Sequence, residues 1–200
     1  VPDNFTGVLE RPLFKRFILI MDELVGGARS CLILFDASIT SEIVKEEIFG
    51  GKDSAQVGSV RVDLELLKTF DEWKEAVTKS KGERDFIVTG LYQAVRDAED
   101  KSVLDEDVIR WVSENSSVPV FGFWDFSIGK GKAAGGLVLD GREQGLKAAA
   151  IIERHFSGTA LKDIPPVTEN KGKFLFSAAE LARWNLTLPE SVRGEATIID

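Results

Sequence analysis

Three short stretches of the sequence place polar or aromatic side chains directly after an apolar run. In the first stretch, Asp36, Ser38 and Thr40 follow the run CLILF and open a helical pattern. Backbone N–H groups and the helix dipole at such a position bind carboxylates and other anions, although simple N-capping explains any one of these hydroxyls as well. The first stretch is therefore a candidate anion site.

The other two stretches combine aromatic and polar groups. Tyr92, the single tyrosine, and Gln93 follow the run DFIV; the ring can stack on a ligand, or it can lie half-buried in a loop. Trp124 and Asp125 follow VPVFGF. An indole wall beside a carboxylate that pairs with an ammonium group is typical of sites for amino acids, whereas packing alone is the alternative for Trp124.

Motifs of catalysis and cofactor binding are absent from the 200 residues. The sequence has no G-x-S-x-G elbow, no Walker loop, and no Cys and His cluster at metal-binding spacing. His155 is the single histidine, and its place at the end of an amphipathic helix is explained by interaction with the helix dipole. The run GKGK at 129–132 has the wrong glycine spacing for a phosphate loop. We expect a protein without catalytic residues, metal or cofactor.

Composition excludes further classes. The net charge of −8, from 25 basic and 33 acidic residues, argues against a general surface for nucleic acid or anionic membranes. With 44% hydrophobic and 29% charged residues, the chain is typical of globular proteins. The single cysteine, Cys31, lies in an apolar run, which predicts a buried thiol and excludes an intramolecular disulfide.

Apolar runs and amphipathic segments alternate along the chain, which predicts an α/β fold with a mainly parallel sheet sandwiched by helices. The expected strands are 4–9, 29–35, 57–66, 85–90, 118–123, 136–140 and 173–176. The expected helices are 13–24, 40–49, 72–79, 105–115, 142–155 and 178–184, followed by a polar tail. Because α/β proteins bind ligands at the carboxyl edge of the sheet, the three stretches are expected to lie at that edge.

Several motifs follow one another in an order typical of one family. They are NFTGV at 4–8, VPVF at 118–121, Gly131 with Gly135-Gly136, GREQG at 141–145, and Gly158 followed by DIP at 163–165. With these motifs the chain resembles the substrate-binding proteins of ABC transporters, in the type I periplasmic-binding group that includes tryptophan-binding receptors. The resemblance implies two α/β lobes, joined by three hinge strands, that clamp a ligand between them.

The resemblance also implies a division of this chain. Residues 1–8 correspond to the first crossing, 9–121 with 166–190 to the complete second lobe, and 122–165 to hinge crossings and a remnant of the first lobe. The N-terminal lobe of the family is largely missing from the chain, so apolar faces near Ile151 and Ile152 are left without partners. We expect that this remnant packs against a second copy in a homodimer, rearranges, or belongs to a trimmed sensor domain.

The function implied by the resemblance is that of a solute-binding module, located in the periplasm or elsewhere outside the cytoplasm, either free or tethered to the membrane. Such a module delivers a small ligand, with an amino acid as first candidate, to the permease of an ABC-type importer by hinge closure. The alternative is a ligand-sensing input domain that reports to a sensor kinase. The expected ligand contacts are Asp36, Ser38, Thr40, Tyr92, Gln93, Trp124 and Asp125.

Overall fold

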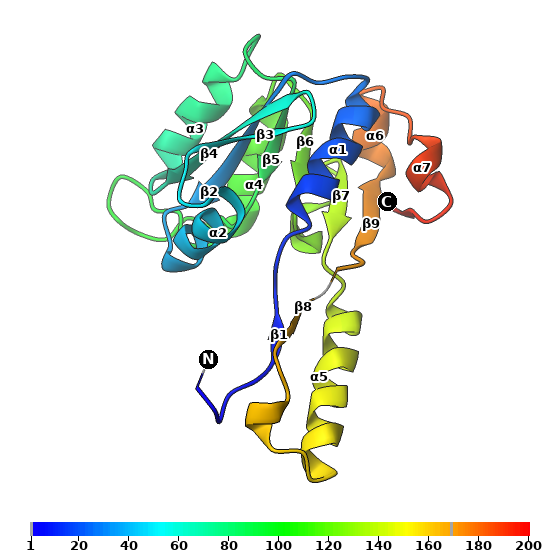
Figure 1. The fold of residues 1–200 in the computed structure, drawn as a ribbon. Coiled ribbons are helices and arrows are strands. Elements are labelled where there is room, and N and C mark those ends of the chain that lie inside the picture. The colour runs from blue at the N-terminus through cyan, green and yellow to red at the C-terminus, as the bar shows by residue number, and fades with distance from the viewer. Residues whose placement is uncertain (1, 169) are drawn as a thin grey trace.

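The computed structural model of the chain describes residues 2–168 and 170–200. Figure 1 shows a main body of sheets and helices, from which a slender stalk extends. The stalk consists of α5 (Gly141–Phe156), the short strands β1 (Val8–Leu9) and β8 (Val167–Thr168), and the 3-10 helix η2 (Leu161–Asp163). The other elements belong to the main body.

A five-stranded sheet in the order β3-β4-β2-β5-β6 forms the centre of the main body. Its strands are β2 (Ser30–Asp36), β3 (Ser54–Val57), β4 (Val60–Leu67), β5 (Phe86–Thr89) and β6 (Val120–Gly122). All neighbouring strands are parallel except β3 and β4, which form an antiparallel pair. The predicted α/β fold with a mainly parallel sheet is confirmed.

Helices cover both faces of this sheet. Successive residues of a strand point to opposite sides, and since β2 is apolar at nearly every position, both faces must be buried. Those of the main body are α1 (Phe14–Val25), α2 (Ile39–Phe49), α3 (Phe70–Lys79), α4 (Asp105–Asn115), α6 (Ala178–Arg183) and α7 (Glu190–Arg193). Cys31, Ile33 and Phe35 of β2 pack in one core with α1, and Cys31 is fully buried as predicted. Leu32 and Leu34 pack in a second core with α3 and α4.

A three-stranded sheet in the order β10-β9-β7 continues the main body beyond β6. It consists of β7 (Gly135–Val138), β9 (Lys173–Ser177) and β10 (Thr197–Ile199). The Ala134 N–H donates to the Val120 carbonyl at 2.7 Å, so β7 lies beside β6. Glycines allow this close approach, because a Cβ on Gly136 would lie 2.1 Å from the carbonyl oxygen of Gly122.

Much of the apolar surface of the stalk is exposed. Ile151 and Ile164 are 9% and 1% exposed, whereas Ile152 and Phe156 are 52% and 84% exposed. β1 pairs in parallel with β8 beside α5. Because Ile151 is buried and Ile152 is exposed, the apolar face of α5 that we expected to lack a partner is only partly covered within the chain. Neither α5 nor any other helix of the described residues is long and apolar enough to cross a lipid bilayer.

The structure differs from the predicted elements in four places, the first being the strand expected at 4–9, which is shortened to β1 (Val8–Leu9). The expected strand at 57–66 is a hairpin that turns at Gly58, whose φ of 58° suits glycine. The expected polar tail contains α7 and β10, which pairs with β9. The strand expected at 136–140, which we placed in the first-lobe remnant, pairs with β9 of the main body, and the stalk helix α5 begins at Gly141. The division into lobes otherwise stays a prediction.

Gly135→Ala should destabilise the main body. An added Cβ would lie 1.9 Å from Cδ1 of Phe176, whose fully buried ring has no free space to enter. We expect the free energy of unfolding, measured by urea denaturation, to fall by about 1–3 kcal/mol.

The matched control is Gly145→Ala in α5, where nothing lies within 4 Å of the added Cβ. In the interior of a helix, alanine is favoured over glycine by about 1 kcal/mol, so this variant should be no less stable than the parent. A Gly135→Ala protein as stable as the parent would contradict the close packing of β7 on β9.

Candidate functional site

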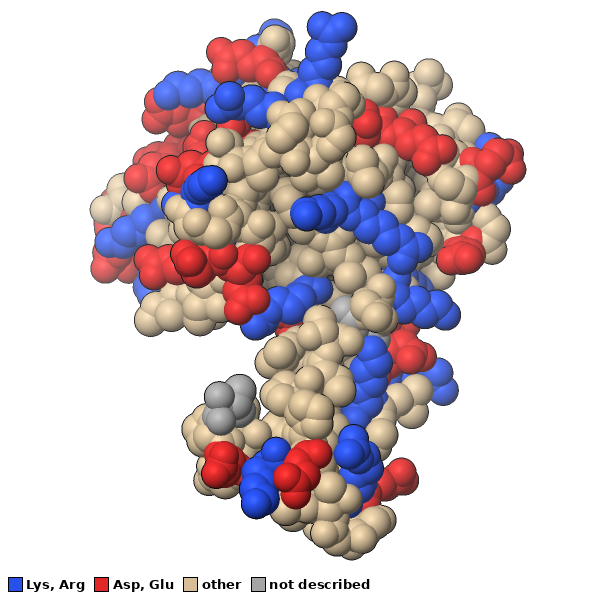
Figure 2. All heavy atoms as spheres, viewed as in Figure 1, with Lys and Arg blue, Asp and Glu red and all other residues tan. Residues whose placement is uncertain are grey.

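The carboxyl ends of β2, β5 and β6 lie at the same edge of the sheet, because these strands are parallel neighbours. A connecting segment follows each of them: the first loop at 37–41, which includes the first turn of α2, the second loop at 90–95, and the third loop at 123–127, which includes a 3-10 turn. Figure 2 shows an open notch between the lower edge of the main body and the foot of the stalk. The predicted stretches therefore lie at one edge, where α/β proteins bind ligands.

The first loop begins α2 as the sequence predicts. Ser38 is the N-cap, and its hydroxyl accepts a hydrogen bond from the Ser41 N–H at 3.3 Å. Ser38 is half-buried and Thr40 is exposed. Both hydroxyls thus lie at the helix start, and N-capping accounts for the one on Ser38.

Asp36 lies beneath the first loop and is only 2% exposed. Its Oδ1 accepts hydrogen bonds from the Ser41 hydroxyl at 2.7 Å and from the Ser38 N–H at 3.2 Å. Its Oδ2 accepts a hydrogen bond from the Ala94 N–H of the second loop at 2.9 Å. The side chain that we predicted as a ligand contact is thus enclosed by protein donors, and its negative charge lies at the helix start where we expected an anion.

Tyr92 is buried, with 1% of its surface exposed. Its ring meets Trp73 edge-on at a centroid distance of 6.3 Å and Phe126 at 5.7 Å. Burial raises the pKa of its phenol. Gln93 is exposed, and its Oε1 accepts a hydrogen bond from the Tyr92 N–H at 3.1 Å. The Tyr92 ring therefore packs against Phe126 from the core side. We had predicted Tyr92 as a ligand contact, but its buried ring is not free to stack on a ligand.

Trp124 is half-buried and is held on several sides. Its indole N–H donates to Oε1 of Glu10 at 2.5 Å. Its ring is nearly parallel to that of Phe126, with 14° between the ring planes and 6.2 Å between the centroids. Phe35 and Phe123 meet it edge-on at centroid distances of 6.1 and 6.0 Å.

Phe126 is a site residue that the sequence did not reveal, because a single ring in a short polar loop has no periodic context. It lies in the 3-10 helix η1 (Asp125–Ser127) and is 40% exposed. Asp125 beside it is exposed as well. We name Trp124, Asp125 and Phe126 the aromatic ledge. Aromatic faces beside a carboxylate suit a planar organic group or an organic cation.

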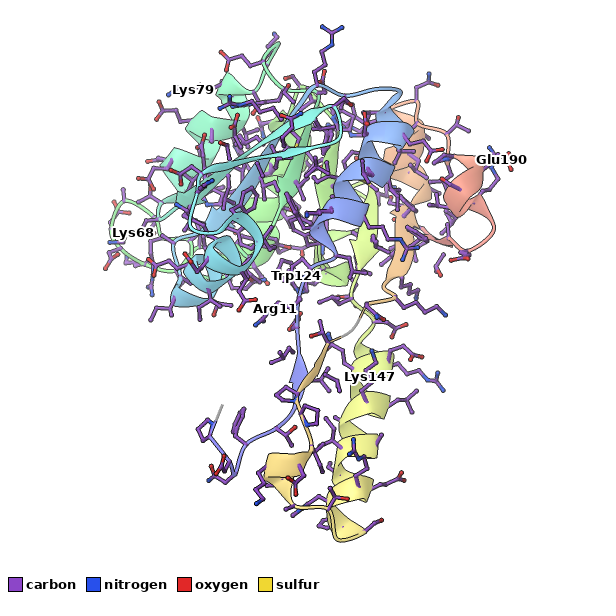
Figure 3. All side chains as sticks on the ribbon, in the orientation of Figure 1. Arg11, Lys68, Lys79, Trp124, Lys147 and Glu190 are labelled. Atoms are coloured by element: carbon purple, nitrogen blue, oxygen red, sulfur yellow. The ribbon has the colours of Figure 1, made fainter. Side chains whose placement is uncertain are left out.

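The chain that leads from β1 into α1 contacts the aromatic ledge. Glu10 accepts the indole hydrogen bond of Trp124, and Arg11 forms an ion pair with Glu47 of α2 at 2.9 Å. Figure 3 shows Arg11 and Trp124 close together where the stalk meets the main body. Residues 10–12 lie between the strand and the helix expected from the sequence, and nothing in their pattern indicates this link between stalk and ledge.

The glycine-rich loop after the ledge donates to carboxylates of the protein itself. The Lys130 N–H donates to Oδ2 of Asp200 at 2.7 Å, and the Gly131 N–H donates to Oε1 of Glu180 at 2.8 Å. Glu180 is buried and also pairs with Arg183 at 3.0 Å. These bonds occupy N–H groups that a phosphate would need, and they fix the loop to α6 and the C-terminal segment.

The charge beside the ledge is negative. Arg11 is paired with Glu47, and Lys132 is paired with Glu106 at 2.7 Å. Asp125 and Glu10 add carboxylates next to the rings. Across residues 2–168 and 170–200, no group of three or more His, Cys, Asp or Glu side chains is placed to hold a metal ion.

Comparison with known proteins identifies the fold. No protein-family model matches the sequence, and no curated protein matches it. Among solved structures, the ABC domain in complex with L-Trp from Streptococcus pneumoniae matches 98% of this chain, with a TM-score of 0.70 and 18% identity. The chain has a periplasmic-binding-protein-like fold.

Two other structures agree with this fold. A substrate-binding protein with adhesive properties from Clostridium difficile, in its ligand-free open form, matches 98% of the chain with a TM-score of 0.68 and 11% identity. A conserved domain protein from Vibrio cholerae O1 biovar El Tor matches 98% with a TM-score of 0.63 and 14% identity. The chain spans 62% to 63% of the length of these three proteins, and the fold expected from the motif order is confirmed.

Glu10→Leu should release the Trp124 indole. A hydrogen bond to a charged acceptor is worth about 1.5–3 kcal/mol, so we expect exchange of the indole N–H with solvent to accelerate by about tenfold. The readout is the indole signal in a proton–nitrogen NMR spectrum, assigned through its loss in Trp124→Phe.

Glu47→Gln is the control for this experiment, because it alters the partner of Arg11 and leaves the indole bond in place. Glu10→Gln, which keeps an oxygen acceptor, should retain most of the protection. Unchanged indole exchange in Glu10→Leu would contradict the role of Glu10.

Proposed function

We propose that this chain is the ligand-binding body of an extracytoplasmic solute-binding protein that serves an ABC-type importer. The observation that carries the proposal is the aromatic ledge at the carboxyl edge of the sheet. Its Trp124 donates a hydrogen bond to Glu10, which lies in the crossing chain that leads from β1 into α1. The likeness in fold to structures described as substrate-binding proteins supports it. No catalytic residue is part of the proposal.

The proposed mechanism is closure about the crossings between the main body and the stalk. The chain passes between them at β1, near Leu139, and at β8. A ligand that touches both sides favours the closed arrangement by its higher affinity for that state. Because Glu10 of the crossing chain bonds to Trp124, closure and ligand contact involve the same side chain.

The proposed ligand is a small molecule with a planar group and an ammonium group, for which an amino acid is the first candidate. The rings of Trp124 and Phe126 provide a face for the planar group, and Asp125 provides a partner for the ammonium. Ser38, Thr40 and Gln93 supply polar contacts at the same edge. L-tryptophan is the first compound to test, because it is bound in the structure from Streptococcus pneumoniae.

A thermal-shift screen against amino acids, peptides and sugars tests the proposal, with calorimetric titration of each compound that stabilises the protein. Binding raises the unfolding temperature in proportion to the free energy of ligation, so a specific ligand gives a concentration-dependent shift. A screen without any such ligand would count against the proposed function.

The double variant Trp124→Ala with Asp125→Asn should lose ligand affinity by about 30-fold or more, since buried tryptophans dominate binding energies. Dissociation constants are measured by calorimetry with the ligand from the screen. Trp184→Ala is the matched control, because Trp184 is also a half-buried tryptophan but lies after α6, away from the ledge. Equal affinities of the double variant and the parent would place the site elsewhere.

A further inference from the structure

We infer that Asp36 is a positioning residue, whose buried carboxylate holds the first and second loops at a fixed separation at the edge of the sheet that carries the aromatic ledge. The inference deepens the proposed function and rests on it, because the two loops flank the proposed ligand site. It assigns to Asp36 a role different from the direct ligand contact predicted from the sequence.

The geometry joins two loops that are far apart in the sequence. Oδ1 of Asp36 accepts from Ser41 and Ser38 of the first loop at 2.7 and 3.2 Å. Oδ2 accepts from the Ala94 N–H, 58 residues further along the chain, at 2.9 Å. The Asp36 N–H also donates to the Leu91 carbonyl at 2.7 Å. Backbone and side chain of one residue thus bond to both loops.

The choice of a carboxylate at this buried position has a physical reason. Burial of a charge is costly unless hydrogen bonds compensate it. The Asp36 carboxylate accepts hydrogen bonds from three donors. It also lies near the N-terminus of α2, whose N-cap is Ser38, and the helix dipole favours a negative charge there. Only a carboxylate has two acceptor oxygens, whereas the side-chain amide of Asn has one acceptor and one donor. Asp36 can therefore satisfy N–H and O–H donors from both loops at once.

The loops that Asp36 joins determine where the site residues lie. The first loop places Ser38 and Thr40 at the start of α2. In the second loop, Ala94 is two residues after Tyr92, whose buried ring contacts Phe126 of the ledge. A fixed distance between Ala94 and the first loop therefore fixes the distance from the hydroxyls to the aromatic ledge.

Asp36→Asn tests the inference with almost no change in side-chain volume. If the amide oxygen bonds to one loop, the amide N–H₂ faces a donor of the other loop. We expect hydrogen exchange of the Ala94 amide in the ligand-free protein, measured by NMR, to accelerate by about tenfold. Amides in the strands of the sheet should keep the exchange rates of the parent protein.

Ser41→Ala is a second variant that removes only the hydroxyl bonded to Oδ1. Because this hydroxyl fixes the carboxylate on the first-loop side, its loss should also accelerate exchange at Ala94 in the second loop, by about two- to threefold. A side chain that merely fills space would not transmit a change from one loop to the other.

Asp85→Asn is the matched control at the opposite end of β2. Asp85 accepts from the N–H groups of Arg29 and Ser30 at 2.7 and 2.9 Å, so it has similar bonds away from the site. This variant should leave the Ala94 amide unchanged. Unchanged Ala94 exchange in Asp36→Asn, or a uniform acceleration across the main body, would overturn the inference.

Affinity for L-tryptophan is the second readout. Asp36→Asn should weaken binding by about tenfold relative to Asp85→Asn, with the parent and both variants titrated by calorimetry. If the parent protein does not bind L-tryptophan, the proposed ligand is wrong, and the exchange rates in the ligand-free protein still decide the role of Asp36. Equal affinities of the two variants, when the parent binds, would overturn the inference.

Discussion

The pairing of β2 with a parallel strand on each side is the constraint on which the rest of the structure depends. β2 is central in its sheet and pairs with β4 over seven residues and with β5 over four. Its side chains enter two separate cores, so both faces are covered by helices. Burial on both faces anchors the strand, and its carboxyl end at Asp36 becomes a fixed point for the loops above it.

The long elements of the main body were predictable because each has a strong local pattern. β2 is an apolar run bounded by a glycine pair and an aspartate, and α1 repeats apolar residues at helical spacing. The hairpin at Gly58 was missed although it leaves a weak local signal: the buried residues Val57 and Val60 are three positions apart, so the alternation expected of one strand breaks at the turn. β10 was missed because only its pairing with β9, which is distant in sequence, identifies it as a strand.

In the site, too, features set by neighbouring residues could be predicted, whereas contacts between residues far apart in the sequence could not. Trp124 and Asp125 follow an apolar strand, so their position at the sheet edge was predictable from neighbouring residues. Glu10 was not, because its contact with Trp124 joins residues 114 positions apart. Asp36 was predicted for its place beside a helix start, but its partner Ala94 belongs to another loop. For Tyr92 the sequence left open whether the ring stacks on a ligand or lies half-buried, and only packing against Trp73 and Phe126 reveals its burial.

The shape of the stalk has a mechanical consequence. α5 contains 16 residues, which corresponds to a rod about 24 Å long at 1.5 Å per residue. The rod leaves the main body close to Leu139 (Figure 1), so in the proposed closure this crossing would be the fulcrum about which α5 turns. A rotation of about 10° at the fulcrum displaces the far end by about 4 Å for a rod of this length. In that closure, small changes of backbone angles near Leu139 would be amplified into larger displacements at Phe156.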